Sequence, residues 1–201
     1  SYNAQLQWRR GQLEMQVSSL LTGMAIQAPP GLGKRAVESL PFRLETGLTP
    51  ESLISDRVLQ DQVSMRWGQA LEAKYVRDLS GRQPKVLRGL IRLGAKAASS
   101  MPDQGVVLRV ANDILDVDAW SDWMQPFTTL PGTGSASAWD LAPQKIELQA
   151  QSVLIQGRDL NRVQLDARKQ GEAWQGRISS VEMEGDIRYL PARGSESAHF
   201  M

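Results

Sequence analysis

One stretch near the start of the chain has the residue types of a nucleotide-binding loop. It runs from Met24 to Arg35, and a short apolar run, a glycine-rich turn and Gly33-Lys34 follow one another in it. In a phosphate-binding loop, backbone N–H groups surround the phosphates, a lysine contacts the terminal phosphate and a Ser or Thr hydroxyl binds magnesium. Here Ala28 stands in the place of the first glycine and Arg35 in that of the hydroxyl residue. A structural turn that caps a short helix is therefore favoured over a nucleotide-dependent enzyme, which remains an alternative.

The other chemistry-bearing side chains form no recognisable catalytic set. Cysteine is absent, which excludes disulfides, thiol nucleophiles and Cys-ligated zinc. The single histidine, His199, lies near the C-terminal end, and one histidine cannot supply a metal cluster. Asp113, Asp116, Asp118 and Asp122 lie close together, but helix capping and a solvated helix face explain them better than acid–base catalysis. The sequence therefore predicts a protein that is not an enzyme and that has no cofactor or metal.

Charge and hydropathy exclude further classes of protein. Lys and Arg total 23 and Asp and Glu total 22, so the chain lacks the basic excess that nucleic-acid binding requires. No apolar run approaches the ~20 residues of a transmembrane helix, and no signal peptide is present. Because the chain opens at Ser1 without a methionine, we expect a segment of a longer protein whose membrane anchor lies elsewhere.

The elements that position these side chains are mainly β-strands. From Pro143 to Pro191, apolar and polar residues alternate in short runs that are separated by turn residues. Successive side chains of a strand point to opposite faces, so each run predicts a strand with one apolar and one polar face. Short connections favour antiparallel pairing. The same pattern recurs over Tyr2–Val17 and Val63–Tyr75, so we predict a mainly β fold, an antiparallel meander with two short helices.

The chain is expected to have three parts. Residues 1–124 form an antiparallel β region with short helices near 33–40, which Pro41 ends, and near 118–124. Residues 125–142, rich in proline, glycine and serine, form a linker. Residues 143–201 form a β-meander that continues the sheet. Whatever covers the apolar face of that sheet decides the function, because an amphipathic sheet must bury its apolar side.

Tryptophan and methionine are enriched in the apolar phase of these strands. The chain holds six Trp and seven Met but only three Phe. These side chains either fill a dry core, in which methionine fills gaps, or line an apolar groove for acyl chains. Periodicity alone favours the core, and a closed β-sandwich with a dry core that serves as a structural or interaction module is one hypothesis.

Several short phrases fall in a fixed order along the chain. They are Ser18–Ile26, Ala28–Ala36, Leu40-Pro41-Phe42, Arg88–Gly94, Met101-Pro102, Gly105-Val106, Leu115–Trp120, Ala150–Gly157, Val163–Ala167, Gly176, Ile178, Gly185-Asp186-Ile187 and Tyr189-Leu190-Pro191. In this order they resemble the phrases of the YhdP family, which are large AsmA-like proteins of the Gram-negative envelope. The resemblance covers nearly the whole chain and favours an apolar groove over a dry core.

The resemblance implies a curved antiparallel sheet, folded into a β-groove with an apolar interior. It implies a periplasmic location within a protein that is anchored in the inner membrane. The implied function is that of a non-enzymatic conduit that moves phospholipid between the inner and outer membranes and supports the outer-membrane permeability barrier. The implied partners are phospholipid acyl chains, adjoining β segments of the parent chain and the two membranes, with no nucleic acid. The candidate groove-lining residues are Leu6, Trp8, Met15, Val17, Val63, Met65, Trp67, Ile146, Leu148, Val153, Ile155, Val163, Leu165, Val181 and Met183.

Overall fold

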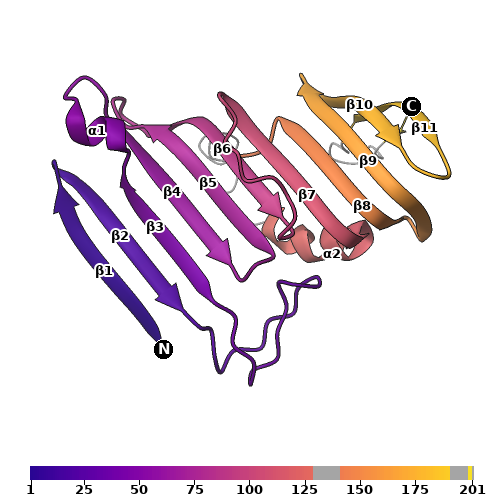
Figure 1. Ribbon diagram of the computed structural model, residues 1–201, viewed down its shortest axis with the longest axis horizontal. Coiled ribbons are helices and arrows are strands. Elements are labelled where there is room, and N and C mark those ends of the chain that lie inside the picture. Colours follow the sequence, from indigo (N-terminus) through magenta and orange to yellow (C-terminus); the bar gives the residue numbers. More distant parts are fainter. Residues whose placement is uncertain (129–140, 191–198, 201) are drawn as a thin grey trace.

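A single open sheet forms the body of the protein (Figure 1). The computed structural model describes residues 1–128, 141–190 and 199–200. Each strand lies beside its neighbours in sequence, from β1 at one edge to β12 at the other. The strands are β1 (Tyr2–Arg9), β2 (Gln12–Ser19), β3 (Phe42–Leu48), β4 (Gln60–Trp67), β5 (Leu71–Asp78), β6 (Lys85–Leu93), β7 (Gly105–Asp116), β8 (Lys145–Ile155), β9 (Arg158–Gln170), β10 (Ala173–Ser179), β11 (Glu184–Leu190) and β12 (His199–Phe200). The helices are α1 (Pro50–Ile54) and α2 (Val117–Thr128). The predicted mainly β, curved sheet with two short helices is confirmed, and the closed β-sandwich is not what the described strands form.

Two neighbouring pairs depart from the predicted antiparallel pattern. β6 pairs with β7, and β7 with β8, in parallel register, whereas all other described pairs are antiparallel. Parallel neighbours cannot be joined by a tight hairpin and need a connection that crosses a face of the sheet. Residues 94–104 make the first crossing, and the segment that begins with α2 makes the second. Most strands of the sheet were therefore predicted, but the direction of these two pairings was not.

The first crossing lies against the face that carries Arg92 and Arg109. The guanidinium of Arg92 donates to the carbonyl of Ala97 at 3.2 Å, and that of Arg109 donates to the carbonyl of Ala98 at 3.4 Å. Gly94 begins the crossing with a φ of +89°. A Cβ there would lie 2.1 Å from the carbonyl oxygen of Ala111, so only glycine allows this close approach.

The second crossing places α2 on the opposite face, behind β7 and β8 in Figure 1. The carboxylate of Asp116 accepts the N–H of Ala119 at 2.8 Å, which caps the start of the helix. Val117 and Trp120 pack against a core cluster of buried residues. That cluster consists of Val110, Leu115, Ala150, Val153 and Val163. The helix predicted near 118–124 is thus present as α2.

Three adjacent strands change their alternation at the same level of the sheet. The register pairs Ala150 with Val163 and then Ser152 with Asn161, so that Gln151 and Arg162 are left without a ladder partner in that pairing. Arg162 has a φ of 53° there. At a local irregularity of this kind, the side chains that follow it point to the opposite face from the one that strict alternation would give. Ala150 and Val153 therefore lie on the same face and in one cluster, although they are an odd number of residues apart.

The helix predicted near 33–40 is wrong. Ile26 and Lys34 exchange backbone hydrogen bonds of 2.9 and 3.0 Å, so the chain folds back on itself there as a tight bridge. A Cβ at Gly33 would lie 2.8 Å from the carbonyl oxygen of Ala28, and this contact, rather than helix formation, requires the glycine. The first helix is instead α1, where Thr49 caps the N–H of Ser52 and proline occupies the first turn.

The predicted linker can be followed only at its ends. Residues 125–128 belong to α2, and residues 141–142 precede β8, but residues 129–140 lie outside the described residues. The sheet register passes directly from β7 to β8. The division of the chain into 1–124, 125–142 and 143–201 stays a prediction.

Candidate functional site

The register places one unbroken apolar row across the sheet from β1 to β11, which we call the central row. Each member pairs with the next on the neighbouring strand, and none has a polar side chain. The members are Ala4, Val17, Leu44, Met65, Ala73, Ile91, Leu108, Ile146, Ala167, Gly176 and Ile187. With neighbouring strands about 4.8 Å apart, this row forms a continuous apolar path perpendicular to the strands.

The rows on either side of the central row are also mainly apolar. Rows on one face are about 7 Å apart, since side chains alternate along each strand. One flanking row comprises Leu6, Met15, Thr46, Val63, Tyr75, Gly89 and Val106. The other comprises Tyr2, Ser19, Phe42, Trp67, Leu71, Leu93, Val110, Leu148, Leu165, Ile178 and Gly185. The three rows together are the apolar face of the sheet.

Among the described residues, no helix covers the apolar face over the first strands, whereas α2 covers part of it over β7 to β9. Leu6 and Trp8 on β1 are 65% and 75% exposed. Val17, Leu44 and Met65 are half-buried although no helix covers them. Under α2, by contrast, the cluster that includes Val110 and Val163 is closed to solvent. An apolar surface of this kind on the described part of the chain is a candidate interaction site.

The candidate groove-lining residues that lie in strands fall on this one face. They are Leu6, Trp8, Met15, Val17, Val63, Met65, Trp67, Ile146, Leu148, Val153, Ile155, Val163 and Leu165. Val153 and Ile155 reach it because β8 changes its alternation at Gln151. Whether these residues contact lipid stays a prediction.

Val181 and Met183 are placed differently from the prediction. Both lie in the connection between β10 and β11, where the N–H of Val181 donates to Asn161 and the carbonyl of Met183 accepts from Ser180. They are 57% and 45% exposed. The predicted strand through them is wrong, because a turn that contains Ser180 separates the two strands there.

Sequence reasoning omitted several central-row members from its groove candidates. Leu44, Ala73, Ile91, Leu108 and Ile187 share the row with the predicted Met65 and Ile146. Their alternation with polar neighbours was visible, but their face depends on the register, which a single strand pattern does not give.

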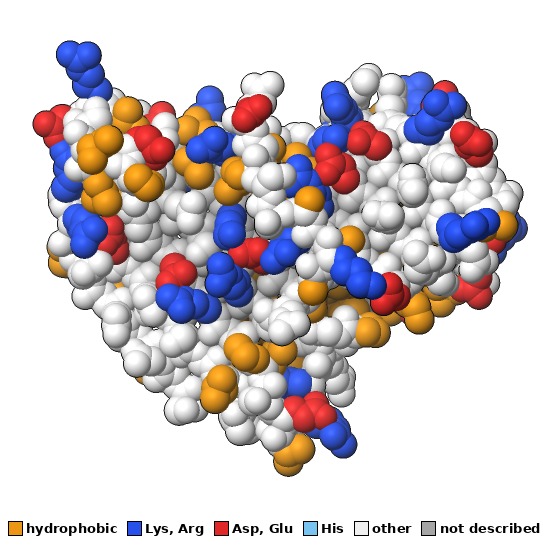
Figure 2. All heavy atoms as spheres, viewed as in Figure 1, with side chains coloured by type: hydrophobic (Ala, Val, Ile, Leu, Met, Phe, Trp, Pro, Cys, Tyr) orange, Lys and Arg blue, Asp and Glu red, His pale blue; other side chains and the backbone are white. Residues whose placement is uncertain are grey.

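The opposite face carries a row of charged residues, which we call the charge ladder. Its members are Arg43, Arg66, Glu72, Arg92, Arg109, Glu147, Asp166, Arg177 and Asp186. Figure 2 shows these kinds of side chain in a band across a face that is otherwise mostly polar. The apolar and polar faces are therefore separated over nearly the whole sheet.

Glu72 is the most enclosed acid of the charge ladder. Its carboxylate accepts from Arg92 at 2.7 Å, from Lys74 at 2.9 Å and from Arg66 at 3.0 Å, and its side chain is 8% exposed. Burial raises the pKa of Glu72, but the hydrogen bonds from Lys74, Arg66 and Arg92 outweigh burial and lower the pKa to about 2. Glu72 is thus a structural anion at neutral pH.

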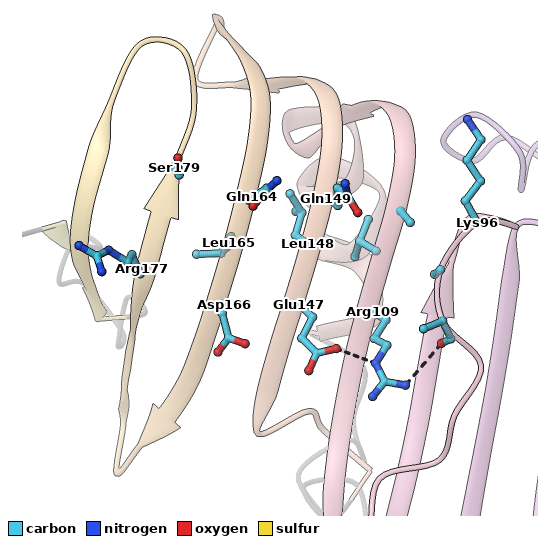
Figure 3. A pocket seen from close by; sticks show the side chains of 14 residues that line it. Lys96, Arg109, Glu147, Leu148, Gln149, Gln164, Leu165, Asp166, Arg177 and Ser179 are labelled. Carbon is cyan, nitrogen blue, oxygen red and sulfur yellow. Dashed lines mark hydrogen bonds and ion pairs between the residues drawn. The ribbon is translucent and has the colours of Figure 1, made fainter.

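A hollow of about 560 Å³ lies on this polar face beside the first crossing (Figure 3). Arg109 and Glu147 face each other in it at 2.6 Å, and Asp166, which also lines it, pairs with Lys145 at 2.9 Å. Because these charges neutralise one another, the hollow is accounted for by the ion pairs that hold the strands and the crossing together.

The motif that resembled a nucleotide-binding loop does not form a phosphate site. The amino group of Lys34 donates to the carbonyls of Met24 and Arg35, the latter at 3.0 Å. Gly33 and Lys34 are not followed directly by a helix. Backbone N–H groups of the stretch bond within its own turn, so the nucleotide alternative has no structural support.

The described residues offer no metal centre and no membrane-spanning helix. No group of three or more His, Cys, Asp or Glu side chains is arranged to hold a metal among them. Asp113 pairs with Lys96 at 2.8 Å, and Asp118 caps a turn. No described helix has the length and apolar character needed to cross a membrane.

Comparison with protein-family models gives a match to the family described as YhdP protein over residues 1–199. Searches of curated proteins and of solved structures return no significant match. The matched range includes β1 to β11 and both helices, so it spans the whole apolar face.

Proposed function

This chain belongs to the YhdP family, and from that premise we propose that it is a segment of a conduit that moves phospholipid between the inner and outer membranes. Bridge-like lipid transport in the cell envelope is consistent with the family. In this proposal the chain works without catalysis and supports the outer-membrane permeability barrier. It lies in the periplasm as part of a protein anchored in the inner membrane.

The central row is the observation that carries the proposal. From β1 to β4 no described helix covers it, and this part spans about 14 Å, at about 4.8 Å per strand spacing. One leaflet of a bilayer is about 15 Å of hydrocarbon, half of the bilayer core, so this part is about as long as the acyl-chain layer of one leaflet. Burial of its methylenes at about 0.8 kcal/mol each would supply the affinity.

The polar face supports the same assignment by exclusion. The charge ladder provides no apolar contact for an acyl chain, and its carboxylates and guanidinium groups are largely paired with each other. Desolvating such pairs to admit hydrocarbon would be unfavourable. The acyl chains are therefore assigned to the apolar face and not to the face of the charge ladder.

A pair of variants in β4 tests the proposal. Met65→Asp places a carboxylate in the central row, whereas Gln62→Asp places one on the polar face of the same strand, at an exposed position. The full chain and both variants are purified, and phospholipid in their organic extracts is measured by mass spectrometry beside an unrelated protein prepared in the same way.

We expect phospholipid to be enriched in the wild-type protein and in Gln62→Asp, and to fall to the background of the unrelated protein in Met65→Asp. A charge in a hydrocarbon contact is costly to bury, which is the reason for the expected loss. An extract without lipid from folded wild-type protein, or equal lipid in both variants, would refute the proposal.

A further inference from the structure

The apolar face ends in a lysine and two amphipathic aromatic residues at one end of its later strands. On β9, Lys169 follows Ala167 of the central row by two residues, so their side chains point to the same face. Lys169 pairs with Trp174 on β10, and Trp174 pairs with Tyr189 on β11. Lys169 is exposed, and the two aromatic residues are half-buried. Tryptophan, tyrosine and lysine are the side chains that gather where hydrocarbon meets polar headgroups.

The same end of the apolar face carries an ion pair on the earlier strands. Asp61 and Arg77 pair in the register, two residues beyond Val63 and Tyr75 of the flanking row. The Nε and Nη2 atoms of Arg77 donate to the carboxylate of Asp61 at 2.9 and 2.5 Å. The hydroxyl of Tyr75 donates to the carbonyl of Leu141 at 3.2 Å. We call this end of the face the polar border; it comprises Asp61, Arg77, Lys169, Trp174 and Tyr189.

The opposite end of the face, which we call the apolar border, is apolar and covered by protein. The indole N–H of Trp67 donates to the carbonyl of Leu32 at 3.1 Å, and the Leu32 side chain is 2% exposed. Leu115 and Val153 pair with each other and lie in the cluster against which Trp120 of α2 packs. α2 lies at the lower ends of β7 and β8 in Figure 1, so it covers this border.

The width of the face between the two borders matches the length of an acyl chain. Lys169 and Leu165 lie four residues apart on β9, on opposite sides of the central row, which is about 14 Å at about 3.4 Å per residue. One leaflet of a bilayer is about 15 Å of hydrocarbon. A phospholipid whose phosphate lies at Lys169 therefore extends its acyl chain along the strand to the apolar border.

The reverse orientation is unfavourable. It would bring a charged headgroup against Trp67 and against the cluster beneath α2, where the described contacts are apolar. Taking a charged group out of water without a partner is costly. The ammonium group of Lys169, by contrast, offers three donors and a positive charge to a phosphate.

We propose that phospholipid lies on this face in one orientation, with its phosphate at Lys169 and its chain ends at the apolar border. Trp174 and Tyr189 contact the glycerol region, between the phosphate and the hydrocarbon. This inference rests on the proposed function and deepens it, because it names the ligand as a lipid that carries a phosphate. Lys169 and α2 both lie beside the central row, so a lipid held in this way can still move along that row.

Two photoreactive lipids test the orientation. One is phosphatidylglycerol with a diazirine on the headgroup, and the other is phosphatidylglycerol with a diazirine near the methyl end of one acyl chain. The full chain is mixed with vesicles of phosphatidylglycerol and phosphatidylethanolamine that contain either probe, and the mixture is irradiated. The labelled peptides are then identified by mass spectrometry.

We expect the two probes to label opposite borders. The headgroup probe should label residues 169–174 severalfold more than residues 115–120, and the chain-end probe should show the reverse preference. Equal labelling of the two regions by each probe, or the opposite preference, would overturn the orientation.

A matched pair of variants tests the role of Lys169. Arg168 and Lys169 are adjacent exposed residues whose side chains point to opposite faces of β9. Lys169→Gln should lower the total attachment of the chain-end phosphatidylglycerol probe severalfold, whereas Arg168→Gln should leave it unchanged. A diacylglycerol with the same photoreactive chain should attach equally to the wild-type protein and to Lys169→Gln, because it has no phosphate. Equal losses of phosphatidylglycerol in the two variants would overturn the assignment of the phosphate to Lys169.

The outcomes separate the two proposals. Attachment without a preference for either border would overturn the orientation and leave the lipid-binding proposal standing. Attachment of neither probe to folded protein would overturn the proposed function, and the orientation with it.

Discussion

Neutralising Glu72 should destabilise the protein in a pH-dependent manner. The substitution Glu72→Gln keeps the shape of the side chain and its place between Arg92, Lys74 and Arg66 but removes its charge. The three cations would then lose the anion that compensates them, and water replaces it poorly because the side chain at this position is only 8% exposed. On the polar face, Glu72 of β5 pairs with Arg66 of β4 and with Arg92 of β6. Removing its charge should therefore lower the free energy of unfolding of the sheet.

The size of the effect follows from the pKa of Glu72. Its folded pKa of about 2 lies below the ordinary value of 4.5. Lowering a pKa by one on folding corresponds to about 1.36 kcal/mol, so the ionised form contributes about 3 kcal/mol at pH 7. A depressed folded pKa gives stability that is present above pH 4.5 and is lost as the pH falls towards 2, so about 1.4 kcal/mol should remain at pH 3.

Urea unfolding of the wild-type protein and Glu72→Gln at pH 7 and pH 3 measures this contribution. Arg66 is 58% exposed, and screening at exposed partners reduces the expected loss at pH 7 to about 2–3 kcal/mol. Glu45→Gln is the matched control, since Glu45 lies on the same polar face, pairs with Arg43 and is 37% exposed. It should cost only a few tenths of a kcal/mol.

Two results would refute the reasoning. An equal loss at both pH values would show that the amide fails for reasons of packing rather than charge. A loss at pH 7 no larger than that of Glu45→Gln would show that the charge ladder does not stabilise the sheet.

Two further predictions concern the attachments of the second crossing. Asp118→Ala removes the acceptor for two backbone N–H groups and should lower the free energy of unfolding, measured with urea, by about 1 kcal/mol. Asp122→Ala, on the exposed side of the helix, should leave the free energy of unfolding unchanged. Equal losses in the two variants would contradict the turn-capping role of Asp118. Burial raises the pKa of Tyr75 from 10.0 to about 12, so the stability that its neutral form contributes is complete below pH 10 and is lost as the pH rises towards 12. Thermal melting should therefore show a smaller loss of stability between pH 9 and pH 11 in Tyr75→Phe than in the wild-type protein. Identical losses in the two proteins would contradict this.

The strands could be predicted from the sequence because their alternation is local. The hairpins Tyr2–Val17 and Val63–Tyr75 were predicted from a period of two, and both are present as β1–β2 and β4–β5. α2 could be predicted because an aspartate precedes an amphipathic run. α1 was missed although Thr49 followed by Pro50 is a helix start signal.

The errors arise where contacts distant in sequence decide the structure. Residues 33–40 have helix-forming composition, but helix propensity is weak. The backbone hydrogen bonds between Ile26 and Lys34 determine the local structure instead. The parallel pairing of β7 was not predicted, since its two crossings look like ordinary loops in the sequence. The common face of the candidate site was also beyond prediction, because it needs the register of all the strands together.

The two crossings also order the assembly of the chain. β8 to β11 are joined by short turns, so their contacts close small loops and form early at little entropic cost. β7 has no hairpin partner on either side and gains its two neighbours only after a longer loop has closed on each face of the sheet. We therefore expect β7 to be the joining strand of the fold: the strands before it and the strands after it pair within their own arrays, and the central row connects the two arrays only when β7 lies between them.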